Sequence, residues 1–149
     1  MSTLKRFTLI LSLIALTACS AAPTSTLATN RQKWEGQRIS HYRFYLSVIC
    51  FCAFRDKMPL TIEIKDGQVV SMLDSQAQSV SEFADTFERY NTIEKLFGVL
   101  DSALNGGADK VTVDYNADYG YPQSTSVDYI ELAMDDEMSF TISEFEILK

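Results

Sequence analysis

The strongest constraint on the fold is a two-residue periodicity that begins at Tyr42. One parity from there onward is apolar or cysteine, at Tyr42, Phe44, Leu46, Val48, Cys50 and Cys52. Such alternation is typical of a strand that buries one face. A second alternating run, 60–64, leads through Asp66-Gly67 into the run 68–73. Asp-Gly between two alternating runs predicts a tight β-hairpin, because both turn positions need positive φ.

The clearest helix is predicted over residues 92–105. Apolar residues recur there at helical spacing, at Ile93, Leu96, Phe97, Leu100 and Leu104. Asn91 followed by Glu94 predicts a capping box at its start, and Gly106-Gly107 predicts its end. A similar capping pattern at 29–32 predicts a short helix that runs through Trp34 to about Arg38.

Three further strands are predicted at 110–115, 125–130 and 138–148. In the last of them Phe140 and Ile142 share one parity, whereas Phe145 and Ile147 share the other. A bulge near Ser143-Glu144 would bring both pairs to the same core. The order of elements predicts an α+β fold, in which an antiparallel sheet of five to six strands carries the main helix and the short N-terminal helix on one face.

The N-terminus predicts a lipoprotein signal peptide over residues 1–18. Lys5 and Arg6 precede an apolar run, 7–18, which is shorter than the roughly 20 residues needed to cross a bilayer. Residues 16–19, Leu-Thr-Ala-Cys, resemble the lipobox of bacterial lipoproteins. This resemblance implies cleavage before Cys19 and attachment of acyl chains such as palmitate to it, and two or three chains hold a small domain stably at a membrane.

The sequence therefore divides into three parts: the signal peptide 1–18, a lipidated flexible tether 19–29 and a single α+β domain 30–149. We expect an extracytoplasmic, lipid-anchored protein, on the periplasmic side of the outer membrane in a Gram-negative cell because serine follows Cys19. Without the signal peptide the chain keeps 11 of its 13 basic residues against 20 acidic ones, a net charge near −9. This acidity argues against binding to nucleic acid.

Cys50 and Cys52 admit three interpretations. Residues two apart on a flat strand lie roughly 6.6 Å apart, near the upper limit for a disulfide, so a bond requires the strand to turn there. Alternatively the pair is thiol-active, since Arg55 and Lys57 could lower a thiol pKa. A copper site that uses Met58 is the third interpretation, because thiolates and thioethers suit Cu(I).

No catalytic constellation is apparent in the sequence. With His41 as the single histidine, a nucleophile triad is not expected. Residues 114–125 depart from a calcium loop, since the sixth position is Tyr119 where glycine is needed. We therefore expect no enzyme, no cofactor and no metal. A tyrosine-rich turn and nearby acids are the binding candidates: Tyr115, Asp118, Tyr119, Tyr121 and Asp128.

Several features occur together in an order that resembles an uncharacterised bacterial lipoprotein family, domain of unknown function 6174. They are Trp34, Tyr42-Arg43-Phe44, Cys50-Phe51-Cys52, Asp66-Gly67-Gln68-Val69, Thr92-Ile93 with Leu96-Phe97, and Gly120-Tyr121-Pro122 followed by Asp128. The resemblance covers about residue 30 to the C-terminus. Asn116 departs from it, because the family has aspartate there; a charged role of that carboxylate would then be lost or moved to Asp114 or Asp118.

The resemblance implies a fold and a location but no activity. We expect a membrane-anchored, non-catalytic binding or envelope accessory module. Its partners would be the membrane, through the lipid on Cys19, and an envelope protein, peptide or small ligand. The alternative is a thiol-active or copper-handling protein that uses Cys50 and Cys52.

Overall fold

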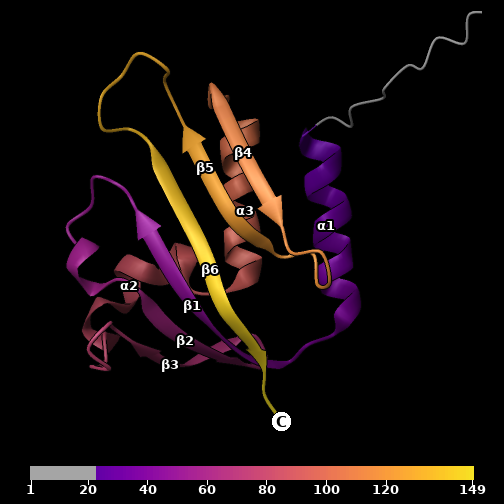
Figure 1. Ribbon diagram of the computed structural model, residues 1–149, viewed down its shortest axis with the longest axis vertical. Coiled ribbons are helices and arrows are strands. Elements are labelled where there is room, and N and C mark those ends of the chain that lie inside the picture. The colour runs from indigo at the N-terminus through magenta and orange to yellow at the C-terminus, as the bar shows by residue number, and fades with distance from the viewer. Residues whose placement is uncertain (1–22) are drawn as a thin grey trace, which may run out of the picture.

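The structure is a computed structural model that describes residues 23–149 (Figure 1). The predicted signal peptide, Cys19 and the start of the predicted tether lie outside the described residues. The helices are α1 (Pro23–Gln37), η1 (Arg55–Lys57), η2 (Ser81–Phe83), α2 (Ala84–Phe87), η3 (Glu88–Tyr90) and α3 (Ile93–Asn105). The strands are β1 (His41–Ile49), β2 (Leu60–Lys65), β3 (Gln68–Leu73), β4 (Lys110–Tyr115), β5 (Pro122–Asp128) and β6 (Met138–Ile147).

The six strands form one sheet in the order β3-β2-β1-β6-β5-β4, and every neighbouring pair is antiparallel. Helix α3 contacts β4, β5 and α1, and Figure 1 shows it behind the sheet. The predicted α+β fold with an antiparallel sheet is therefore confirmed. β1 and β6 form the centre, so the first and last strands of the chain are neighbours in the middle of the sheet.

Strand β1 has the predicted alternation. Phe44 and Leu46 are fully buried, whereas Arg43 and Tyr45 lie on the open face of the sheet. The predicted hairpin is also confirmed: Asp66-Gly67 joins β2 to β3 with φ angles of 51° and 75°.

The predicted bulge lies in β6 opposite Phe44. The register shifts between Arg43 and Tyr45, and Glu144 has a φ of 50°. The bulge turns Phe145 toward the core, where it packs on Trp34, Tyr42 and Tyr121. The expectation that Ile147 shares this core is wrong. It is 49% exposed, because it occupies the last position of the strand, at the end of the sheet.

Helix α1 begins earlier than the sequence predicted. Residues 23–29 of the expected tether are helical, so a capping box at 29–32 does not describe the start of this helix. Proline at the first helical position fits a helix start. The helix lacks an apolar stripe and is stabilised by tertiary contacts: Leu27 and Trp34 are buried, and Arg31 donates a hydrogen bond to the Phe97 carbonyl at 3.0 Å.

Helix α3 buries the predicted apolar stripe, but its cap was predicted one residue too early. Thr92 is the N-cap, and its hydroxyl accepts from the Lys95 N–H at 3.2 Å. Asn91 is buried and makes no cap. Glu94 does not reach back to the helix start, because its carboxylate accepts hydrogen bonds from Trp34 and Tyr42 instead.

Candidate functional site

The tyrosines predicted as binding candidates are used in packing. Tyr121 is buried and lies edge-on to Trp34, while the half-buried Tyr119 stacks on Tyr121. Tyr115 stacks on Phe97 of α3. Burial raises the pKa of both Tyr115 and Tyr121, as expected for phenols removed from water. These rings join α1 and α3 to the sheet, and Tyr115 also lines a pocket together with Leu104 and Val111.

The two acidic candidates lie apart from one another. Asp118 is exposed in the turn between β4 and β5, whereas Asp128 ends β5 at the other end of that strand. The structure therefore does not bring the five predicted binding residues together into one site.

Asn116 organises the turn before β5. Its side-chain oxygen accepts from the N–H groups of Asp118 and Tyr119 at 3.0 and 2.9 Å, and its amide nitrogen donates to Tyr121 and Gln123. Accepting two backbone N–H groups requires an oxygen but no charge. An uncharged amide at this position therefore holds the turn.

A polar contact missed by sequence reasoning lies between α1, β1 and α3. The Trp34 Nε1–H donates to Glu94 at 2.7 Å, and the Tyr42 hydroxyl lies 3.4 Å from the other Glu94 oxygen. Burial and the neighbouring Glu94 charge raise the pKa of Tyr42. Glu94 lies 60 residues from Trp34 and 52 from Tyr42 in the chain, so no local spacing could have revealed the contact.

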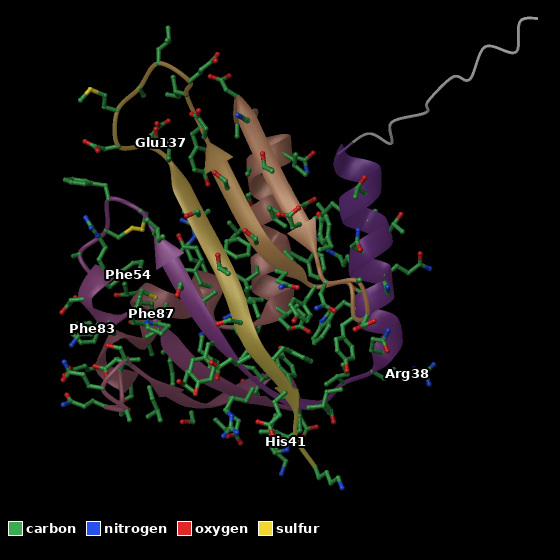
Figure 2. The ribbon with its side chains drawn as sticks, in the orientation of Figure 1. Arg38, His41, Phe54, Phe83, Phe87 and Glu137 are labelled. Carbon is green, nitrogen blue, oxygen red and sulfur yellow. A yellow bond between two sulfur atoms is a disulfide. The ribbon has the colours of Figure 1, made fainter. Side chains whose placement is uncertain are left out.

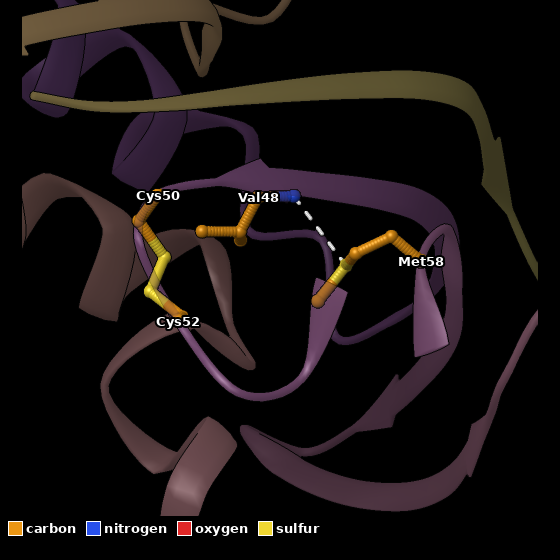
Figure 3. Close-up of a disulfide and its surroundings, with 4 residues drawn as sticks. All are labelled: Val48, Cys50, Cys52 and Met58. Atoms are coloured by element: carbon orange, nitrogen blue, oxygen red, sulfur yellow. Dashed lines mark hydrogen bonds between the residues drawn. A yellow bond between two sulfur atoms is a disulfide. The ribbon is translucent and has the colours of Figure 1, made fainter. Parts of the chain in front are cut away.

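Cys50 and Cys52 form a disulfide immediately after β1 ends at Ile49 (Figure 3). Their Cα atoms are 5.2 Å apart, and the Cys52 N–H donates to the Cys50 carbonyl at 2.8 Å. The chain thus makes the turn that a bond between these positions requires. Phe51 lies at the tip of this turn with 80% of its surface exposed.

Two of the groups named for a copper or thiol-active site, Met58 and Lys57, have other partners, whereas no side-chain hydrogen bond or ion pair is found for Arg55 among the described residues. The Met58 sulfur accepts from the Val48 N–H at 3.4 Å, and Figure 3 shows Val48 between it and the cysteine sulfurs. The Lys57 ammonium lies 3.8 Å from Asp74 and over the Phe83 ring. Within residues 23–149 no group of three or more His, Cys, Asp or Glu side chains is placed to hold a metal ion.

Exposed apolar side chains gather on two loops at one end of the sheet, which we call the loop end: Ile49, Phe51, Ile130, Leu132 and Met134. Ile49 pairs with Ser139 at the start of β6, so the loop after β1 begins beside the end of the loop between β5 and β6. Leu132 is 94% exposed and Met134 is 88% exposed. Gathered apolar side chains of this kind mark interaction sites more often than single ones do.

The loop end is also acidic. The loop before β6 contains Glu131, Asp135, Asp136 and Glu137 but no basic residue, and Figure 2 shows Glu137 at this end. Burial first, and then the charges of neighbouring carboxylates, raise the pKa of Asp128. The ion pairs found within residues 23–149 include none of these carboxylates.

We expect the disulfide to make a modest contribution to stability. In the chain-entropy description, a bond that closes a three-residue loop contributes about 1.5 kcal/mol. Reducing it in the Cys19→Ser chain is therefore expected to lower the free energy of unfolding in urea by about that amount. Intact mass after alkylation provides the control: two labels must appear only after reduction. Two labels without reductant would contradict the bond.

None of the described helices is long and apolar enough to cross a membrane. Comparison of the chain with curated proteins and with solved structures finds no match. A family model described as "Family of unknown function (DUF6174)" matches residues 26–147, which is most of the chain. The chain therefore belongs to the family of unknown function DUF6174.

Proposed function

We propose that this chain is a lipid-anchored, extracytoplasmic accessory domain that acts by docking to a partner and not by catalysis. The observation that carries the proposal is the exposure of Phe51, Leu132 and Met134 on the two loops of the loop end. Three large apolar side chains exposed at 80% or more cost solubility, and a docking surface gives them a use.

The disulfide supports this interpretation because it holds Phe51 in place. A bond between the residues on either side of Phe51 restricts the backbone at the loop tip. An aromatic side chain that is fixed before binding loses less conformational entropy on docking. The bonded Cys50 and Cys52 then restrain the backbone that presents the Phe51 side chain to a partner.

The thiol-active or copper-handling alternative has less support. It requires a cation beside the thiols or a third soft ligand. Lys57 is paired with Asp74 and the Met58 sulfur accepts from the Val48 N–H, so of the groups named for this role only Arg55 has no other partner among the described residues. Docking therefore explains the disulfide-closed turn better than thiol or copper chemistry does.

The predicted lipid would place the loop end near the membrane. Helix α1 begins at Pro23, only four residues after Cys19, and four extended residues span at most about 14 Å. In Figure 1 the start of α1 and the loop between β5 and β6 both lie toward the upper end of the molecule. A partner of the loop end would then be met close to the bilayer.

The lipid anchor is tested by Cys19→Ala in the full-length precursor expressed in a bacterium. We expect the unaltered chain to sediment with membranes and to carry the added mass of its acyl chains, whereas the variant is found in the soluble fraction. Cys50→Ala/Cys52→Ala is the matched control and is expected to stay with the membranes. Membrane retention of Cys19→Ala would rule out this anchor.

Docking is tested by placing a photo-crosslinking phenylalanine analogue at Phe51 in the membrane-anchored chain. We expect a light-dependent covalent adduct from this position. The same analogue at Val70, which is 55% exposed on the edge strand β3, is the control and is expected to give none. Equal adducts from both positions, or none from Phe51, would contradict docking through the loop end.

A further inference from the structure

We propose that the loop end docks a protein segment in which lysine or arginine residues flank apolar side chains. This inference rests on the proposed function, because it names the chemistry of the partner that the same surface would bind. Its two requirements, an apolar contact and positive charge, come from two separate features of the loop end.

The requirement for apolar groups on the partner follows from the exposed side chains of Phe51, Leu132 and Met134. Leu132 and Met134 leave almost their whole side chains in water, and Phe51 is exposed on the disulfide-closed turn at the same end of the sheet. Leucine and methionine adapt to the shape of a partner, whereas the aromatic ring has few rotatable bonds and its backbone is restrained by the disulfide. A partner must present apolar groups to cover these three side chains.

The requirement for positive charge follows from the carboxylates in the loop that carries Leu132 and Met134. The Glu131 N–H donates to Asp109, the residue before β4, at 2.8 Å. Glu131, Asp135 and Glu137 are exposed and take part in none of the ion pairs among the described residues. Carboxylates without a partner are the natural complement of guanidinium and ammonium groups.

The same charges favour a protein over the bilayer as the occupant. Exposed Glu131, Asp135 and Glu137 lie in the same loop as the apolar tips. Inserting the exposed apolar side chains into a membrane would draw the three carboxylates toward the headgroups. An anionic membrane surface would repel these carboxylates. A cationic apolar segment meets both features at once, as basic amphipathic helices do in acidic grooves.

The test uses the chain from residue 19 onward with Cys19→Ser, which retains every described residue and carries no lipid. The probe is a synthetic amphipathic peptide of leucine and lysine, and the comparison peptide has glutamate in place of lysine. Binding is measured by fluorescence anisotropy at low and high salt. We expect binding of the lysine peptide only, weakened about tenfold or more by high salt.

Variants separate the two requirements. Glu131→Gln/Glu137→Gln is expected to weaken binding about tenfold by removing charge, and Leu132→Ser/Met134→Ser by a similar factor through loss of apolar contact. Val70→Ser is the matched control and is expected to leave affinity unchanged. Unchanged affinity in both double variants would overturn the inference, because the peptide would then be binding elsewhere.

Two further outcomes distinguish the inference from the function on which it rests. If Phe51 gives crosslinked adducts in cells but the lysine peptide does not bind, docking stands and the cationic partner is wrong. If the unlipidated chain binds phosphatidylcholine vesicles through Leu132 and Met134 and ignores the peptide, the occupant is the bilayer and the inference is overturned.

Discussion

Replacing Trp34 by alanine is expected to lower the free energy of unfolding by about 3–5 kcal/mol, the range for removal of a buried large aromatic side chain. Trp34 is 4% exposed and meets Tyr42, Tyr121 and Phe145 edge to face. It is the main apolar side chain through which α1 reaches the sheet. Because domains of this size are stable by only about 5–15 kcal/mol, urea denaturation followed by circular dichroism will show a large shift.

Trp34→Phe separates packing from hydrogen bonding. Phenylalanine keeps an aromatic ring but removes the Nε1–H that donates to Glu94 at 2.7 Å. Hydrogen bonds to charged groups contribute more than neutral ones, so we expect a loss of about 1–2 kcal/mol. If Trp34→Ala were no worse than Trp34→Phe, the aromatic cluster would not be what holds α1 in place.

Replacing Gly120 by alanine is expected to destabilise the domain by about 3 kcal/mol, from two sources. Gly120 has a φ of 84°, where a side chain costs roughly 1–2 kcal/mol. A Cβ atom there would also lie 2.7 Å from the Asn30 carbonyl oxygen and 2.9 Å from the Lys33 Cβ. Relieving this overlap requires α1 to move from the turn, at an overpacking cost of about 1–3 kcal/mol.

Gly67→Ala is the matched control for this prediction. Gly67 has a similar φ of 75°, but a Cβ atom added there meets nothing within 4 Å. Gly67→Ala is expected to lower the free energy of unfolding only by the cost of a side chain at positive φ, about 1–2 kcal/mol. Equal losses for the two variants, measured by urea denaturation, would show that the turn does not press against α1.

Local patterns in the sequence predicted most of the sheet. The alternation from Tyr42, the Asp66-Gly67 turn and the stripe on α3 each depend on neighbours in the chain, because side-chain periodicity and turn geometry are local properties. The β6 bulge was also predictable, since two apolar pairs of opposite parity can reach one core only if an extra residue intervenes.

The start of α1 and the role of Glu94 were not predictable. Helix α1 carries no apolar stripe and is held by contacts with α3 and the aromatic residues of the sheet. Glu94 occupies the reciprocal position of a capping box, yet Trp34 supplies a better donor from a distant part of the chain. Tertiary contacts override local preference wherever they contribute more free energy.

The candidate site also has features that local spacing determined and features that only tertiary contacts determined. The spacing of Cys50 and Cys52 showed that a disulfide requires a turn, because covalent geometry is local, but it left the thiol and copper interpretations open. The tyrosines named as binding candidates pack against other rings in the structure, and the exposure of Leu132 and Met134 in an acidic loop was not predicted. Whether a side chain is covered depends on which elements fold over it. The sequence by itself therefore determined the strands, the main helix and the geometric condition on the cysteine pair. Only the tertiary structure decided which aromatic side chains pack inside and which apolar ones remain exposed.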